Sequence, residues 1–164
     1  LALDYLPGAV TLDPVVEKPD ADLTSSVVWF HAYVTNVDRT PRNTNMLVWH
    51  RRLWLIDHGA TLYIHHTWHN YRQRSREPFP MIQDHVLLPG ASVLREVDPK
   101  MTGRLTFDII DRIVRAIPDD WLGGDSVFGE THEHREAYME YLLSRLEPPH
   151  GFLEEAIRAR SRYL

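Results

Sequence analysis

The chain has 164 residues, of which 43% are hydrophobic and 25% charged, and its formal net charge is −5 with the histidines neutral. These values are typical of one globular domain and exclude a disordered or fibrous chain. The absence of cysteine excludes disulfides, thiolate metal sites and cysteine nucleophiles. The negative charge disfavours nucleic acid and anionic membranes as partners. No apolar run approaches the roughly 18 residues of a membrane span and no basic leader is present, so we expect a cytoplasmic protein.

The first part of the chain predicts an extended lead-in followed by a helix. Residues 1–19 contain three prolines and a Pro-Gly pair, which is typical of a looping segment. Asp20 is a candidate N-cap, and the apolar spacing after it predicts a mostly buried helix over residues 21–34. A polar loop over residues 36–43 follows, because Pro41 disfavours helix at the residue before it.

The next segments predict a β-hairpin and then a helical region. Residues 45–49 and 52–56 are short and rich in apolar side chains, and two residues separate them, as in a tight hairpin. The later part of the chain predicts helices over residues 81–86, 106–116, 130–146 and 152–163, with Thr106 as an N-cap. No internal repeat divides the sequence. We therefore expect one domain over residues 1–164, mainly α with a small β-hairpin (α+β), comprising a lead-in (1–19), a functional region (20–59) and a helical subdomain (60–164).

The polar loop and the end of the hairpin carry the residues that point to chemistry. Asp38 and Asn43 lie five residues apart on the loop, and Asp57 comes nineteen residues after Asp38, directly beyond the second predicted strand. A hairpin that links the two turns brings all three side chains to one end. Phosphoryl transfer needs this set, a carboxylate that orients the acceptor hydroxyl and two oxygen ligands for a divalent cation on the nucleotide phosphates.

The same stretch resembles a known family. The order Asp-x4-Asn, two short strands and Asp-x-Gly is that of protein-kinase-like folds, and the wording of residues 36–45 and 53–59 resembles the HipA-like kinases, in particular actinobacterial HipA-like domain proteins. It is more distantly similar to phosphatidylinositol 4-kinases. The resemblance extends to residues 3–8 and 118–122. It implies the C-terminal lobe of a protein-kinase-like fold, with ATP and Mg²⁺ as cofactors and a hydroxyl group as the acceptor.

The resemblance also assigns roles to individual residues. Asp38 matches the catalytic aspartate, while Asn43 and Asp57 match the metal ligands. His58 stands where protein kinases have the phenylalanine of Asp-Phe-Gly. Arg39 follows the catalytic aspartate, as in this branch of the family, and is a candidate to contact the acceptor or a phosphate.

The family pattern further implies a part that the chain does not supply. Leu3, Asp4, Tyr5 and Leu6 fall at the hinge that binds the adenine and joins the two lobes. The N-terminal lobe normally supplies a phosphate-covering loop and a strand lysine. The chain has no such glycine-rich motif, and of its eighteen basic residues only Lys18 and Lys100 are lysines. We therefore expect the N-terminal lobe to come from upstream sequence or from another chain, and we expect this piece alone to be inactive.

Two other readings remain open. The first is a catalytically inactive kinase-like module that binds a nucleotide or a protein. The second is a metal hydrolase with histidine ligands, because His65, His66 and His69 lie close in sequence and the spacing of His65 and His69 suits one face of a helix. The second reading lacks a glutamate between these histidines and a clear third ligand.

Overall fold

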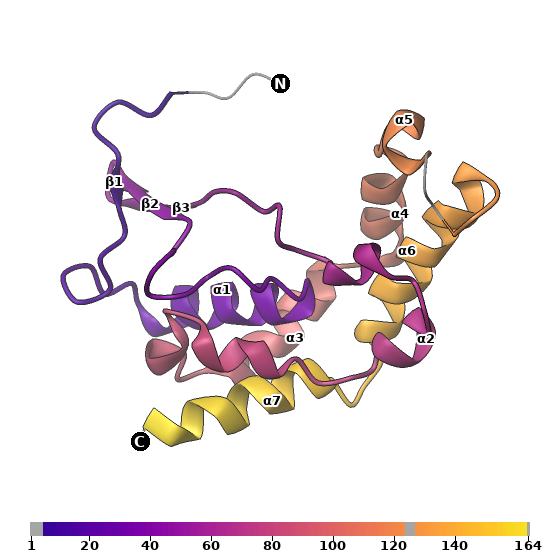
Figure 1. The fold of residues 1–164 in the computed structure, drawn as a ribbon. Coiled ribbons are helices and arrows are strands. Elements are labelled where there is room, and N and C mark those ends of the chain that lie inside the picture. Colours follow the sequence, from indigo (N-terminus) through magenta and orange to yellow (C-terminus); the bar gives the residue numbers. More distant parts are fainter. Residues whose placement is uncertain (1–4, 124–126, 164) are drawn as a thin grey trace.

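The computed structural model describes residues 5–123 and 127–163. A three-stranded sheet and a larger helical region make up the fold (Figure 1). The elements are β1 (Val10–Thr11), α1 (Ala21–Tyr33), β2 (Met46–Trp49), β3 (Arg52–Leu55), α2 (Tyr71–Arg74), α3 (Leu94–Arg104), α4 (Phe107–Arg115), α5 (Asp119–Leu122), α6 (Thr131–Arg145) and α7 (Gly151–Arg160), with short 3₁₀ helices at Tyr63–His66, Pro80–Asp84, Leu88–Gly90 and Ser161–Tyr163. The expected mainly helical α+β class is confirmed.

The sheet is antiparallel, in the order β1-β2-β3, and all three strands come from the N-terminal half of the chain. Val48 pairs with Leu53 across the predicted hairpin, and both residues of the turn, His50 and Arg51, have positive φ angles of 47° and 61°. Two consecutive positive φ angles give the turn twist that suits a two-residue hairpin. β1 was not expected, because the proline-rich lead-in has no alternating pattern; it pairs with β2.

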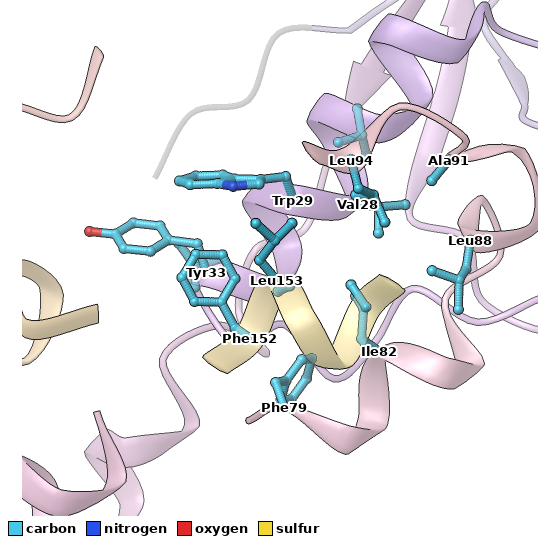
Figure 2. Close-up of a cluster of buried hydrophobic side chains, with 14 of the residues drawn as sticks. Val28, Trp29, Tyr33, Phe79, Ile82, Leu88, Ala91, Leu94, Phe152 and Leu153 are labelled. Carbon is cyan, nitrogen blue, oxygen red and sulfur yellow. The ribbon is translucent and has the colours of Figure 1, made fainter. Parts of the chain in front are cut away.

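Helix α1 forms the centre of the helical core and packs against α3 and α7. Asp20 caps it as expected, since the Leu23 amide donates to the Asp20 carboxylate at 2.8 Å. Trp29 is fully buried and meets the Phe152 ring edge-on at 5.2 Å between centroids (Figure 2). Because α1 is covered on several sides, its buried residues include polar Thr24, Ser25 and His31 as well as apolar ones.

Helix α3 was not predicted, and the reason lies in Pro99. A proline inside a helix removes one backbone hydrogen bond and crowds the preceding turn, and it conceals the helical pattern here. Tertiary contacts offset that cost, because Leu94 and Val97 are buried against the core. Asp98 also accepts hydrogen bonds from the Trp29 indole at 2.7 Å and the His150 ring at 2.9 Å.

The remaining predicted helices are confirmed with one exception. Helices α4, α6 and α7 match the expected ranges, and the Thr106 hydroxyl accepts from the Ile109 amide as the N-cap of α4. Residues 81–86 were expected to be helical, but the segment Pro80–Asp84 is a 3₁₀ helix that ends before an extended His85. Too few apolar positions there define a helical face. Among the described helices, none combines the length and the apolar character needed to cross a membrane.

Candidate functional site

The loop after α1 turns sharply and then closes on itself. Thr35 follows the helix with a φ angle of 50°, and the Asn36 carboxamide accepts from the Asp38 amide at 2.9 Å. Thr40 and Asn43 exchange two backbone hydrogen bonds of 3.1 Å around Pro41. Asparagine at a turn and proline inside it suit this geometry. The loop therefore presents its polar side chains from a defined backbone.

Two amide side chains converge on the Asp38 carboxylate. The Nδ2 atoms of Asn43 and Asn45 donate to Oδ2 of Asp38 at 2.8 Å and 2.9 Å. The pairing of Asp38 with Asn43 agrees with the prediction that the two lie together. Asn45 was missed, although an Asn-x-Asn pair at the end of a polar loop is a signal that could have drawn attention to it.

Asp57 lies just beyond β3 in a left-handed conformation, with a φ angle of 47°. Its Oδ1 accepts from the Gly59 amide at 3.2 Å, so the side chain folds over its own turn. A Cβ added at Gly59 would approach this Oδ1 to 3.3 Å, which explains why a small residue suits the position. The turn holds the backbone and one carboxylate oxygen in place.

Arg39 connects the Asp38 loop to the Asp57 turn. It is 1% exposed, and its guanidinium donates to the backbone carbonyls of Asn45, Ile56 and Asp57, the last at 3.0 Å. Burial lowers the pKa of Arg39, while the charges of Asp38 and Asp57 oppose that shift. Both carboxylates therefore act on one buried cation.

This placement corrects the interpretation of Arg39. The sequence suggested a contact with the acceptor or a phosphate, but the side chain is buried and its two Nη atoms donate to main-chain carbonyls. A planar guanidinium with five donors can join several carbonyls at once, and lysine cannot reproduce that arrangement. Arg39 is thus part of the support beneath the candidate site.

A buried histidine pair lies behind Arg39. The Leu87 amide donates to Nδ1 of His85 at 3.1 Å, so the proton of that ring is on Nε2, which donates to Nδ1 of His31 at 2.9 Å. Burial, with smaller contributions from neighbouring cations and histidines, lowers the pKa of His31 to about 2 and that of His85 to about 3. Both rings are therefore neutral. Nδ1 of His58 lies 3.3 Å from the Arg39 guanidinium, so the turn that carries Asp57 contacts Arg39 through a side chain as well.

A cavity of about 630 Å³ opens beside the loop. Its lining includes Asp13, Arg42, Asn43, Asn45 and Ile56. Asp38 and Asp57 are not among its lining residues. The cavity therefore borders the candidate site on the side of the two asparagines.

Asn43 and Asp57 carry oxygen atoms of the kind that hard divalent cations bind. Asn43 uses its Nδ2 atom on Asp38, which leaves its amide oxygen to coordinate, and Asp57 uses one oxygen on Gly59. Carboxylate and amide oxygens suit Mg²⁺, which is usually held by one or two protein groups together with phosphates and water. Within residues 5–123 and 127–163, no three or more histidine and acidic side chains cluster to form a metal site.

The other predicted positions lie in the lead-in and beside the hairpin turn, and two of them are not described. Leu3 and Asp4 fall outside the described residues, and Tyr5 is 84% exposed. The lead-in after Leu6 contacts the hairpin, because the Trp49 indole donates to the Pro7 carbonyl at 2.9 Å. Lys18 lines a hollow beside the hairpin turn at His50–Arg51, which is the end of the hairpin opposite to Asp57.

The histidine cluster does not form the arrangement that the hydrolase reading requires. His65 and His66 belong to a 3₁₀ helix that ends before His69, so His65 and His69 do not share an α-helical face. All three side chains are exposed. The His65 and His66 rings lie 4.1 Å apart between centroids, which places them against each other.

No family model, no curated protein and no solved structure matches the chain.

Proposed function

We propose that this chain is the C-terminal lobe of a HipA-like phosphotransferase that uses ATP and Mg²⁺. The observation that carries the proposal is the bridge made by Arg39, which donates to the Asn45 carbonyl on one loop and to the Asp57 carbonyl on the other. The bridge supports the expectation that two turns nineteen residues apart act as one unit. The N-terminal lobe comes from upstream sequence or from another chain.

Each residue then has a defined task. Asp38 accepts or orients the proton of the acceptor hydroxyl, and Asn43 and Asp57 supply oxygen ligands to the cation. A divalent cation held by these residues would supply charge neutralisation for the phosphates during transfer. Leu3, Asp4, Tyr5 and Leu6 contribute to the adenine site at the junction with the missing lobe.

A second candidate is a nucleotide-binding module without transfer activity. The position of Lys18 at the far end of the hairpin favours it, because the only other lysine in the chain is Lys100 in α3. An active enzyme therefore needs its phosphate-binding lysine from the other lobe. A partner lobe without that lysine leaves a binding role.

The test uses the protein together with its N-terminal lobe and measures Mg²⁺-dependent ATP binding by calorimetry and ATP turnover. We expect Asp38→Asn to lower kcat by about 100-fold or more, because a positioned general base contributes about 10²- to 10⁴-fold. Asp57→Asn should abolish the Mg²⁺ dependence of ATP binding. Asp120→Asn, at an exposed site in α5, is the matched control.

The outcomes separate the candidates. Binding together with transfer that depends on Asp38 supports the phosphotransferase. Binding without transfer assigns the chain to the nucleotide-binding module, and the absence of Mg²⁺-dependent ATP binding contradicts both. Turnover by the isolated 164-residue chain would contradict the need for a second lobe.

A further inference from the structure

The two hydrogen bonds to the Asp38 carboxylate both go to the same oxygen. Its Oδ2 accepts both Asn43 Nδ2 at 2.8 Å and Asn45 Nδ2 at 2.9 Å. Its Oδ1 accepts no hydrogen bond from the part of the chain that the structure describes. The two oxygens are therefore unequal, and Oδ1 is the one available to an incoming hydroxyl.

The orientation of the Asn45 amide follows from the groups that it faces. Besides Oδ2, it lies 3.2 Å from the Asp38 backbone carbonyl. A carboxylate and a carbonyl oxygen both accept, so the atom between them must be the NH₂ group rather than the amide oxygen. The Asn45 amide thus donates to Asp38 at both its carboxylate and its backbone carbonyl.

The backbone of Asn45 is itself fixed. Its carbonyl accepts from the Ile56 amide at 3.0 Å and from the buried Arg39 guanidinium. Its φ angle of 48° is left-handed, a conformation that asparagine tolerates better than most residues. The amide therefore projects from a support that is attached to the end of β3.

We propose that Asn45 is a positioning residue that holds Asp38 with Oδ1 toward the acceptor hydroxyl. The inference rests on the proposed phosphotransfer. In that step the acceptor proton passes to Oδ1 of Asp38 and the acceptor oxygen bonds to the γ-phosphorus. The bond to the bridging oxygen breaks, and its electron pair leaves with ADP. Because Asn43 is also the proposed cation ligand, Asn45 is the amide whose task concerns Asp38 alone.

The first test replaces the amide and keeps the backbone. Asn45→Gly removes both side-chain bonds, while glycine adopts the left-handed conformation without cost. Asn70→Gly is the matched control, since Asn70 has a φ angle of 53° and is exposed. In the protein with its N-terminal lobe, hydrolysis of Mg²⁺-ATP uses water as the acceptor. We expect kcat to fall about 10- to 100-fold, as for other supporting contacts to a reacting group, and KM for ATP to stay within about twofold.

The second test uses the isosteric variant Asn45→Asp. It places a carboxylate where the amide lay 2.9 Å from Oδ2, and two carboxylates at this distance share a proton. We expect a larger loss of kcat near neutral pH and a partial recovery as the pH falls, because one protonated carboxyl then donates to the other. A purely structural role would not give this change in the pH profile.

The results separate the positioning role of Asn45 from the proposed phosphotransferase function. If Asn45→Gly retains the kcat of the wild type, loses activity only through KM, or matches Asn70→Gly, the positioning role is wrong and the phosphotransferase stands. A wild-type protein that neither binds nor hydrolyses Mg²⁺-ATP overturns the proposed function, and this inference with it. Melting temperatures of the variants show whether any loss reflects unfolding.

Discussion

Two buried arginines organise two different regions of this molecule. Arg145, on α6, is 2% exposed and donates to the carbonyls of Tyr33, Ala32 and Ser75 at 2.7, 2.9 and 3.0 Å. Arg39 is 1% exposed and donates to carbonyls on the Asp38 loop and the Asp57 turn. Each guanidinium therefore supplies hydrogen-bond donors to main-chain carbonyls in its own region.

The difference lies in what surrounds each arginine. Arg145 meets the C-terminal end of α1, where the helix dipole favours a cation, and its guanidinium lies 5.0 Å from the centre of the Phe152 ring. Arg39 sits among irregular turns whose side chains are polar and partly exposed. The first arginine is part of the hydrophobic core, whereas the second sets the geometry of loops. The same chemistry thus supports global stability in one region and local order in the other.

The largest expected effect comes from removing Arg145. Arg145→Met removes the guanidinium donors to the buried carbonyls of Tyr33, Ser75 and Ala32, of which Ala32 still accepts from the Thr35 amide at 3.3 Å. Each lost partner costs about 1–3 kcal/mol. We expect the free energy of unfolding to fall by about 4 kcal/mol in urea denaturation. Arg112→Met, at an exposed position in α4, is the control and should change it little. Equal effects of the two substitutions would contradict the role of Arg145 in the core.

The histidine pair between the two regions gives the next effect. The folded protein keeps His31 and His85 neutral, with pKa values lowered to about 2 and about 3, whereas the unfolded chain takes up protons below about pH 6.5. Stability from this pair is therefore complete above pH 6.5 and is lost as the pH falls below it. Because of this pair, the free energy of unfolding should fall by about 3 kcal/mol between pH 7.5 and pH 5.5.

A substitution isolates this contribution. His31→Asn keeps an acceptor near the position of Nδ1 and removes one titrating group, so the loss of stability on acidification should shrink by about half. His132→Gln, at an exposed position on α6, should leave the pH dependence as it is. If the free energy of unfolding falls equally with pH in wild type and His31→Asn, the buried pair does not cause the loss of stability on acidification.

The smallest global effect is expected at Arg39. Arg39→Lys keeps the charge but loses the planar guanidinium that joins the two loops. The free energy needed to open the Asn45–Ile56 end of the hairpin locally should therefore fall by about 2 kcal/mol. Hydrogen exchange of the Ile56 amide, which donates to the Asn45 carbonyl at 3.0 Å, should accelerate about 30-fold. Arg42→Lys on the same loop is the control. A large drop in melting temperature, as for Arg145, would remove the distinction between the regions.

Local signals in the sequence predicted much of the fold. Asp20 marked the start of α1, Thr106 that of α4, and the two apolar runs around His50–Arg51 predicted the hairpin. These features depend on neighbours a few residues away, which is why they can be read directly. α3 could not be read in this way, because Pro99 argues against a helix and only burial against α1 overrides it.

The candidate site divides in the same manner. The grouping of Asp38 with Asn43 follows from spacing on one loop, and that contact is present. The roles of Arg39 and Asn45 depend on whether a side chain points inward or outward, and a polar loop has no periodicity that reveals this. Their contacts join residues up to nineteen positions apart.

By itself the sequence determined the starts of α1 and α4 and the hairpin, because capping, turn chemistry and apolar spacing act over short distances. Only the tertiary structure decided that α3 forms, that β1 joins the sheet and that the Arg39 guanidinium faces the protein interior. The physical reason is desolvation. A buried donor or acceptor must find a partner wherever the chain brings one, and that partner can lie far away in sequence.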